Sequence, residues 1–260
     1  MLLTGEEMGA YGRIRLNLCG ELEKRTVLEA DAFKNLKLWA PRVAEALTVV
    51  DGEGKLFRAR VLGIKEDTAE VLLFEKMASQ KGILPEVTLL QALPDRERME
   101  LIIEKAVELG VTRIIPFKSN RSISLEEREL RQKKAHKWGD IARRASKQSR
   151  RDFMARVLSY TTFEGALKEA GNGAVEAVLW EKEGSRYIKE ILTAADIPGA
   201  QSGGAKKITL LSGPEGGFDD DEIAKARSSG FIPVTLGPWI LRAETAAITA
   251  VALVMYEVSC

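Results

Sequence analysis

The chain has 260 residues, of which 45% are hydrophobic and 30% are charged. This composition excludes wholesale disorder, and the length is sufficient for one or two domains with a core of their own. The longest apolar run, residues 246–256, is too short to span a bilayer. Acidic residues near the first methionine argue against a signal peptide, and only two cysteines occur, so we expect a cytoplasmic protein without disulfides. The single histidine, His136, excludes sites that need several imidazoles, and we predict no bound metal.

The basic residues are concentrated in one segment. The whole chain has a net charge of +1, yet residues 128–156 contain eleven Lys or Arg and three Asp or Glu, a local charge of +8 that leaves −7 for the remainder. Trp138, Ile141, Ala142 and Ala145 recur there at helical spacing, which predicts a helix with one buried stripe. Both a solvated helix face and a surface that binds a polyanion are consistent with this pattern.

Residues 1–80 carry the signals of short β-strands. Strands are predicted at residues 13–18, 47–50, 56–64 and 68–74, with a hairpin turn at Asp51–Gly54. Several short strands without a long helix predict a small β-barrel. Ser79–Gly82, followed by Pro85, predicts a linker to a second domain.

Residues 85–260 alternate between strand and helix patterns. Strands are predicted at residues 87–93, 111–117, 175–180, 208–211 and 233–236, and helices at 97–109, along the basic segment, and at 187–195, 220–228 and 244–258. The composition of residues 199–207 predicts a loop. This alternation is typical of an α/β fold in which helices cover both faces of a mostly parallel sheet.

Two glycine-bearing loops follow predicted strands and precede predicted helices. The first reads LSGPEGG over residues 211–217, and the second reads LGPWILRAET over residues 236–245. Ligands of parallel sheets bind at the carboxyl ends of the strands, where glycines let the main chain approach a ligand closely. Leu236, Ile240 and Leu241 would form an apolar slot for a planar ring. Neither loop has the dinucleotide fingerprint or the ending of a P-loop.

These blocks resemble a known group of enzymes. Residues 212–251, SGPEGGFDDDEIAKARSSGFIPVTLGPWILRAETAAITAV, are similar to the signature of the SPOUT-superfamily methyltransferases, and within it to the RsmE type, which methylates N3 of a uridine in small-subunit (16S) ribosomal RNA. Residues 92–122 and 137–151 resemble further segments of that family in the same order. The resemblance implies a SPOUT methyltransferase domain over residues 85–260 with a trefoil knot near its C-terminus, an exception to the rule against knots, and a PUA-like β-barrel over residues 1–80. It also implies S-adenosylmethionine as cofactor, a homodimer, and ribosomal RNA in the small subunit or a late assembly particle as partner.

The resemblance also assigns residues to the site. Its two cofactor loops correspond here to Leu211, Ser212, Gly213, Glu215, Gly216, Gly217, Leu236, Gly237, Ile240, Leu241 and Thr245. Arg242 and Glu244 match the arginine and glutamate of the family's LR-x-ETA block, and we take both as catalytic candidates. Arg242 would stabilise negative charge on uracil as N3 loses its proton. Two roles are open for each of Glu244 and Glu215. Either residue would remove the N3 proton as the base, or it would anchor a backbone amide at a helix start.

Candidate RNA-binding residues are spread over both domains. They are Lys34, Lys37, Arg121, Arg143, Arg144, Lys147 and Arg151. The segment 33–39 departs from the family, which usually has a His-His pair early in the chain, so the precise RNA target is open. Trp39 would either stack on a base or, as we favour, fill the barrel. The alternatives for the whole chain are a SPOUT enzyme that methylates another base or a ribose 2′-hydroxyl, a ribosome-associated RNA-binding protein without turnover, and a metabolic enzyme that uses a nucleotide.

Overall fold

The computed structural model describes residues 11–78, 84–123, 137–170, 173–182, 184–195 and 206–259. The chain divides into two compact units. The first consists of residues 1–81 together with 143–154, and the second of residues 82–142 together with 155–260. The predicted linker at residues 79–82 and most of the predicted loop at 199–207 lie outside the described residues.

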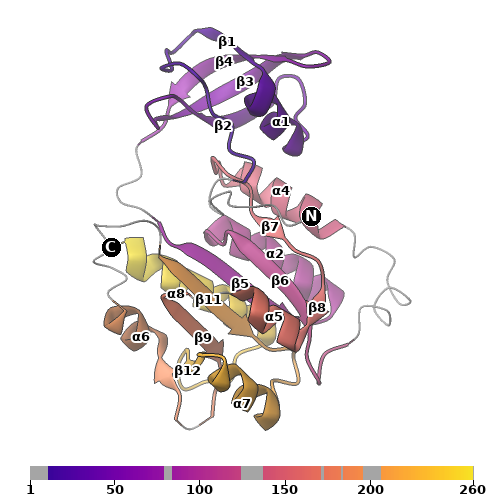
Figure 1. The fold of residues 1–260 in the computed structure, drawn as a ribbon, viewed down its shortest axis with the longest axis vertical. Helices are drawn as coiled ribbons and strands as arrows, with labels where there is room; N and C mark the ends of the chain where they lie inside the picture. The colour runs from indigo at the N-terminus through magenta and orange to yellow at the C-terminus, as the bar shows by residue number, and fades with distance from the viewer. Residues whose placement is uncertain are drawn as a thin grey trace. The chain divides into compact units, whose positions relative to one another are not determined.

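The first unit contains a four-stranded antiparallel sheet (Figure 1). Its strands are β1 (Arg25–Leu28), β2 (Ala46–Val50), β3 (Leu56–Ile64) and β4 (Ala69–Lys76), in the order β1-β4-β3-β2. The hairpin of β2 and β3 and the strand after it agree with the sequence prediction. The predicted strand at residues 13–18 is reduced to one bridge between Arg15 and Val50.

Neither β1 nor α1 (Ala30–Leu38) was predicted from local sequence patterns. The helix has nine residues, no side-chain cap at Glu29, and buries only Phe33 and Leu36, so it depends on packing against the sheet rather than on helix propensity. Trp39 ends it and is buried, and its indole donates a hydrogen bond to the carbonyl of Gly12 at 2.6 Å. Trp39 is thus a core residue of this unit, as favoured from the sequence.

Residues 143–154 belong to the first unit through polar and apolar contacts. Lys147 pairs with Glu45 at 2.7 Å, and the hydroxyl of Thr48 donates to the carbonyl of Arg150 at 2.8 Å. Arg13 pairs with Asp152 at 2.7 Å, and Met154 lies in the hydrophobic core. These contacts join positions about a hundred residues apart in the chain, which local sequence patterns do not reveal.

The second unit is built on a parallel sheet. Its strands are β5 (Glu86–Ala92), β6 (Arg113–Lys118), β7 (Arg156–Val157), β8 (Thr161–Thr162), β9 (Val175–Leu179), β10 (Arg186–Tyr187), β11 (Lys207–Ser212) and β12 (Ile232–Thr235). The order is β10-β12-β9-β11-β5-β6-β7, with β8 paired to β6. Its central strands are buried almost throughout, as expected of a sheet covered on both faces.

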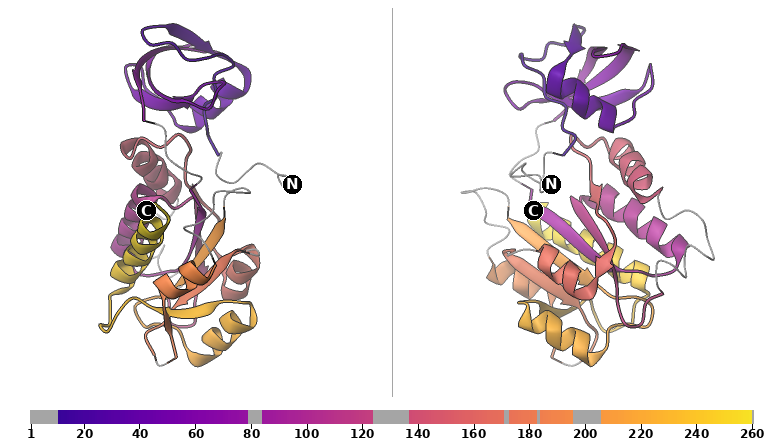
Figure 2. Two further views of the ribbon diagram at one scale, coloured as in Figure 1. Left: turned by 90° about the vertical axis from the view of Figure 1, so that its left-hand side faces the viewer. Right: turned by 45° about the vertical axis from the view of Figure 1, so that its right-hand side comes forward.

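Helices cover both faces of this sheet (Figures 1 and 2). They are α2 (Arg96–Leu109), α6 (Ile188–Ala194) and α8 (Ala243–Ser259), which contact one another, and α5 (Phe163–Ala170) and α7 (Asp220–Ser228), which share a core on the other face. The remaining helix, α4 (Trp138–Gln148), buries Trp138, Ile141, Ala142 and Ala145, so the predicted stripe is confirmed. Helix α5 is the one described helix of this unit that the sequence analysis missed.

The strand order brings three chain segments to one end of the sheet. Strand β9 lies between β11 and β12, and all three run parallel. The segments that leave their carboxyl ends at residues 179–181, 212–217 and 236–242 are therefore neighbours. Both glycine-bearing loops are among them.

Candidate active site

A cavity of about 500 Å³ opens at this carboxyl edge of the sheet. Its wall comes from the ends of β9, β11 and β12, the two loops, and the starts of α2 and α8. The lining residues are Arg98, Leu179, Trp180, Glu181, Ser212, Gly213, Pro214, Glu215, Gly216, Gly217, Phe218, Val234, Thr235, Leu236, Trp239, Ile240, Leu241, Arg242, Ala243 and Ala246.

The first loop, residues 213–217, is shaped by its glycines. Gly217 has a φ of +67°, a backbone angle that residues other than glycine rarely adopt. A Cβ on Gly216 would lie 3.1 Å from the Cβ of Arg121, so a larger residue there would crowd its neighbour. Arg121 also donates from Nη1 to the carbonyl of Gly216 at 3.0 Å. The loop is therefore held against the segment that follows β6.

A second set of contacts fixes the end of this loop, where α7 begins. Asp219 and Glu222 form a capping box in which each side chain accepts from the other's backbone N–H. Asn120 donates from Nδ2 to Asp219 at 2.7 Å and from its backbone N–H to Glu222 at 2.9 Å. The bond from Asn120 and the bond from the Glu222 backbone hold the pKa of Asp219 below its usual range.

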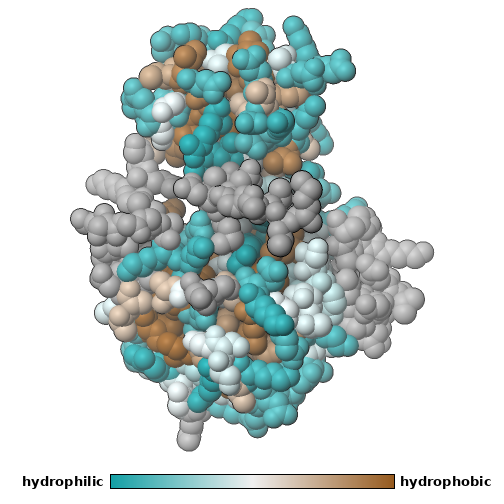
Figure 3. Space-filling model, in the orientation of Figure 1, coloured by the Kyte–Doolittle hydropathy of each residue, from teal (hydrophilic) through white to brown (hydrophobic). Residues whose placement is uncertain are grey.

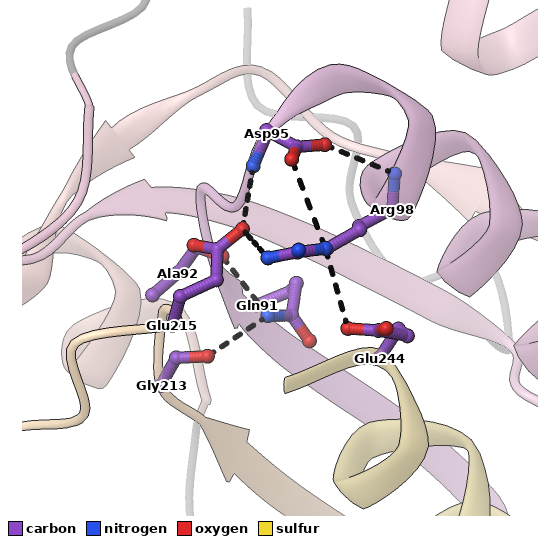
Figure 4. Close-up of polar contacts among 7 residues, drawn as sticks. All are labelled: Gln91, Ala92, Asp95, Arg98, Gly213, Glu215 and Glu244. Carbon is purple, nitrogen blue, oxygen red and sulfur yellow. Dashed lines mark hydrogen bonds and ion pairs between the residues drawn. The ribbon is translucent and has the colours of Figure 1, made fainter. Parts of the chain in front are cut away.

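Arg98 joins the two loops at the start of α2 (Figure 4). Its Nη1 donates to Oε1 of Glu215 at 2.7 Å, and its Nε lies 3.7 Å from Oε2 of Glu244. The same Glu215 oxygen accepts the backbone N–H of Asp95, the N-cap of α2, at 3.0 Å. The hydrogen bond to Glu215 raises the pKa of Arg98. Of the two roles open for Glu215, the structure shows the anchoring of a backbone amide at a helix start.

Further contacts from Gln91 and Phe218 hold the first loop. Gln91, at the end of β5, is fully buried and donates from Nε2 to the carbonyls of Ala92 and Gly213, at 2.9 and 3.3 Å (Figure 4). Phe218, directly after the loop, stacks on Phe117 and meets Phe163 edge-on. These contacts set the position of the loop backbone at the cavity.

The second loop is far more exposed. Trp239 and Ile240 leave 79% and 86% of their surface accessible although both line the cavity. The contacts that shape its start are local, between the hydroxyl of Thr235 and the backbone of Gly237. Arg242 is exposed at the cavity, and the part of the chain that the structure describes places no carboxylate in ion-pair contact with it.

The structure gathers most of the predicted cofactor residues. Ser212, Gly213, Glu215, Gly216, Gly217, Leu236, Ile240 and Leu241 line the cavity, as does Arg242. Leu211 is fully buried in the core, and Gly237, Thr245 and Glu244 are not among the lining residues. Glu244 instead faces Arg98 with a side chain that is 14% exposed.

Several predicted RNA-binding residues have partners within their own unit. Lys34 pairs with Asp31 at 3.0 Å, Lys37 donates to the carbonyl of Glu66 at 3.3 Å, and Lys147 pairs with Glu45. Burial lowers the pKa of Arg151 to about 10. Arg144 is exposed and Arg143 is half-buried. Among the predicted RNA-binding residues of α4, Arg144 is the one whose side chain is exposed.

Sequence reasoning missed part of the cavity wall. Arg98, Trp180, Glu181 and Phe218 line it without having been singled out. The signal was available in part, because Trp180 and Glu181 end a predicted strand at the same edge of the sheet. No local sequence pattern indicates that Arg98 lies at the cavity, because Glu215 and Glu244, which it contacts, lie 117 and 146 positions further along the chain.

The described residues contain no group of three or more potential metal ligands and no helix long and apolar enough to cross a membrane. On the face shown in Figure 3, hydrophilic residues separate smaller hydrophobic areas.

Comparisons with known proteins address the same region. A family model described as an RNA methyltransferase domain matches residues 82–255. Two proteins called ribosomal RNA small subunit methyltransferase E are 32% identical to this chain. The one from Synechocystis aligns over 80% of this chain and 65% of its own length, and the one from Mycobacterium tuberculosis over 82% and 79%. The crystal structure of the Neisseria gonorrhoeae protein of that name, bound to S-adenosyl methionine, is 28% identical, has a TM-score of 0.61 and covers 94% of this chain and 96% of that chain.

A parallel sheet with a cavity between two glycine-bearing loops, together with the matching family model, defines an RNA methyltransferase of the SPOUT class. The predicted α/β fold is confirmed: the N-terminal sheet is antiparallel and the C-terminal sheet is parallel. The PUA-like barrel stays a prediction. The chain belongs to the ribosomal RNA small subunit methyltransferase E family. The trefoil knot and the homodimer stay predictions.

The site fits S-adenosylmethionine. A volume of about 500 Å³ lies within the usual range for pockets that hold a small ligand. Leu236, Ile240 and Leu241 supply apolar surface, and the first loop presents backbone where Gly216 and Gly217 carry no side chain. We therefore take this cavity as the place where the cofactor would bind.

Proposed function

We propose that this protein transfers the methyl group of S-adenosylmethionine to N3 of a uridine in 16S ribosomal RNA. The observation that carries the proposal is the cavity at the carboxyl ends of β9, β11 and β12, which is lined by both predicted cofactor loops and by Arg242. Membership of the family supports the substrate class, and the resemblance of residues 212–251 to the uracil-N3 enzymes supports the position on the base.

The chemistry requires alignment and charge stabilisation. The cofactor, when bound, supplies a methyl group on a sulfonium that is already strongly electrophilic. The protein must hold N3 in line with that methyl group and stabilise the uracil oxygens as N3 loses its proton. Arg242 lines the cavity and has no carboxylate in ion-pair contact among the described residues, so we propose that its charge is available for these oxygens.

The glutamates are differently placed. Glu215 accepts hydrogen bonds from Arg98 and from the backbone of Asp95, and Glu244 lies beside the same guanidinium. Of the two candidate bases, only Glu215 lines the cavity, and its Oε1 already accepts both of those bonds. These contacts favour a supporting role for both carboxylates over direct proton removal.

N3 lies on the Watson–Crick edge, so the target base must be unpaired or flipped out to react. We propose that basic residues of α4 bind phosphates of the RNA. Reversing the charge of Arg143 and Arg144 should weaken RNA binding, and it should reduce the slope of log K against log salt by roughly one to two, because each lost phosphate contact contributes ~0.7–0.9.

Filter binding at several salt concentrations measures this slope. A matched control is the charge reversal of Lys168 and Arg227, which are exposed on α5 and α7 and change the net charge equally. An unchanged slope for the α4 variant would remove this helix from the RNA interface.

A homodimer is the second part of the proposal. Helix α8 buries Ala247, Ala250, Val251 and Val254, while other apolar residues of the same helix are only partly covered. A helix that is apolar on several sides is suited to packing against both its own core and a second copy. Sedimentation velocity of the full chain measures the oligomeric state directly.

The activity is tested on 16S rRNA from a strain that lacks this protein. Purified protein and S-adenosylmethionine carrying a labelled methyl group are incubated with naked rRNA and, separately, with small subunits. We expect one labelled uridine that stops reverse transcription, because a methyl group on N3 blocks pairing. Mass spectrometry of the nucleosides distinguishes this product from a 2′-O-methyl group or another methylated base, and either of those would overturn the assignment to N3. An absence of label on both substrates would overturn the transfer itself.

A further inference from the structure

Within the described residues, Arg98 is the one cation seen to contact both Glu215 of the first loop and Glu244 at the start of α8. It projects from the first turn of α2, and its side chain is 34% exposed. Glu215 comes from the first loop and Glu244 from the first turn of α8, directly after the second loop. Figure 4 shows both carboxylates directed at the same guanidinium. The contact therefore bridges three elements that are far apart in the sequence.

The two arginines at this cavity differ in their surroundings. Arg98 is close to Asp95, Glu215 and Glu244, at 3.7, 2.7 and 3.7 Å. Arg242 precedes Glu244 by two residues, and Arg242 and Glu215 line the same cavity. A carboxylate released from Arg98 would have Arg242 as a near cation. Because opposite charges attract, such a carboxylate would reduce the charge that Arg242 offers to uracil.

We propose that Arg98 is a positioning residue that keeps Glu215 and Glu244 away from Arg242, so that the guanidinium of Arg242 stays available to the substrate. The inference rests on the proposed function, since it concerns the charge that Arg242 offers to the uracil oxygens. Arg98 does not touch the reacting atoms in this arrangement. Its effect on the reaction is transmitted through the two glutamates.

The fold should survive the loss of Arg98. Asp95 caps α2 by accepting the backbone N–H of residue 98, and that bond does not use the guanidinium. The bond from the backbone N–H of Asp95 to Glu215 does not use the guanidinium either. Arg98→Met retains most of the length of the side chain without its charge. Lys105→Met on the same helix, whose side chain contacts Glu104 and Glu108 on the surface, is the matched control.

The experiment compares four proteins: the wild type, R98M, the double variant R98M/E244Q and K105M. Turnover on 16S rRNA is measured at saturating cofactor, and the affinity for S-adenosylmethionine is measured by calorimetry without RNA. We expect R98M to lose ~30- to 100-fold in turnover, somewhat less than the loss of a charge-stabilising group itself. Its cofactor affinity should change less than about threefold, since Arg121 and Gln91 still hold the backbone of the first loop.

The double variant is the decisive measurement. If Glu244 neutralises Arg242 once Arg98 is gone, removing the charge of Glu244 should restore turnover to at least ~10-fold above that of R98M. Two substitutions with independent effects would not give such a recovery. A double variant no faster than R98M would overturn the proposal, as would an R98M protein with wild-type turnover. A large loss of cofactor affinity or thermal stability in R98M, unrelieved in the double variant, would show a purely structural role. An inactive wild type would instead contradict the proposed function.

Discussion

The two loops at the cavity are built in opposite ways. The first is held by Arg98, Arg121 and Gln91, and it ends in the buried ring of Phe218. The second is shaped mainly by local contacts, and it exposes Trp239 and Ile240 almost completely. Both nevertheless line the same cavity.

The difference separates two tasks. A wall with many contacts to other elements has a fixed backbone, which suits the recognition of a ligand that is the same in every turnover. A wall with few such contacts is easily rearranged and leaves its side chains free for a second molecule. We therefore propose that the first loop mainly recognises the cofactor. The second loop would contact the RNA or a partner copy.

The most direct test compares one aromatic residue from each region. Phe218→Ala should destabilise the protein by ~3–5 kcal/mol, because it removes a buried ring stacked on Phe117. Trp239→Ala should change the free energy of unfolding by less than ~0.5 kcal/mol, because the side chain is exposed. Urea denaturation followed by circular dichroism measures both values. If the two variants were equally destabilised, the second loop would be as firmly packed as the first, and the comparison would fail.

Arg242→Ala tests the chemical role of the second loop. Its guanidinium has no ion-pair partner among the described residues, so its loss should not disturb the fold. Turnover should fall ~100- to 1000-fold, the usual effect of removing one group that stabilises developing charge. The affinity for S-adenosylmethionine, measured by calorimetry, should change less than about threefold. A variant with near-normal turnover would exclude Arg242 from catalysis.

The sequence predicted the second unit well because its elements have strong local patterns. The strands β5, β9 and β11 are short segments rich in Val, Ile, Leu and Ala, and α7 begins with a capping box that can be read from Asp219 and Glu222. The two loops were found for the same reason, since glycines between a strand and a helix are a local signal. The resemblance then supplied the chemistry that the pattern alone left open.

Other features depend on contacts between distant residues. Arg98 was missed because only the folded chain brings it to Glu215 and Glu244. Helix α1 was missed because it lacks a side-chain cap and depends on tertiary packing. The attachment of residues 143–154 to the first unit likewise depends on partners such as Glu45 and Thr48, about a hundred positions away. Local periodicity carries no information about such pairs.

The smallest predicted effect concerns the anchor of the first loop at the start of α7. Asp219 accepts bonds from Asn120 and from the backbone of Glu222, which lower its pKa. A carboxylate whose pKa is lower in the folded state than in the unfolded state contributes stability above the unfolded value of about 3.9. That contribution is lost as the pH falls through the folded pKa.

Asp219→Ala should therefore lower the melting temperature slightly at pH 7, and the difference from the wild type should shrink as the pH falls below about 4. Asp221→Ala, which removes an exposed carboxylate from the same helix turn, controls for the general effect of charge near the helix start. Thermal unfolding of the three proteins between pH 7 and pH 3 gives the comparison. A difference that stayed constant across this range would mean that the ionised form of Asp219 is not what holds the loop to Asn120.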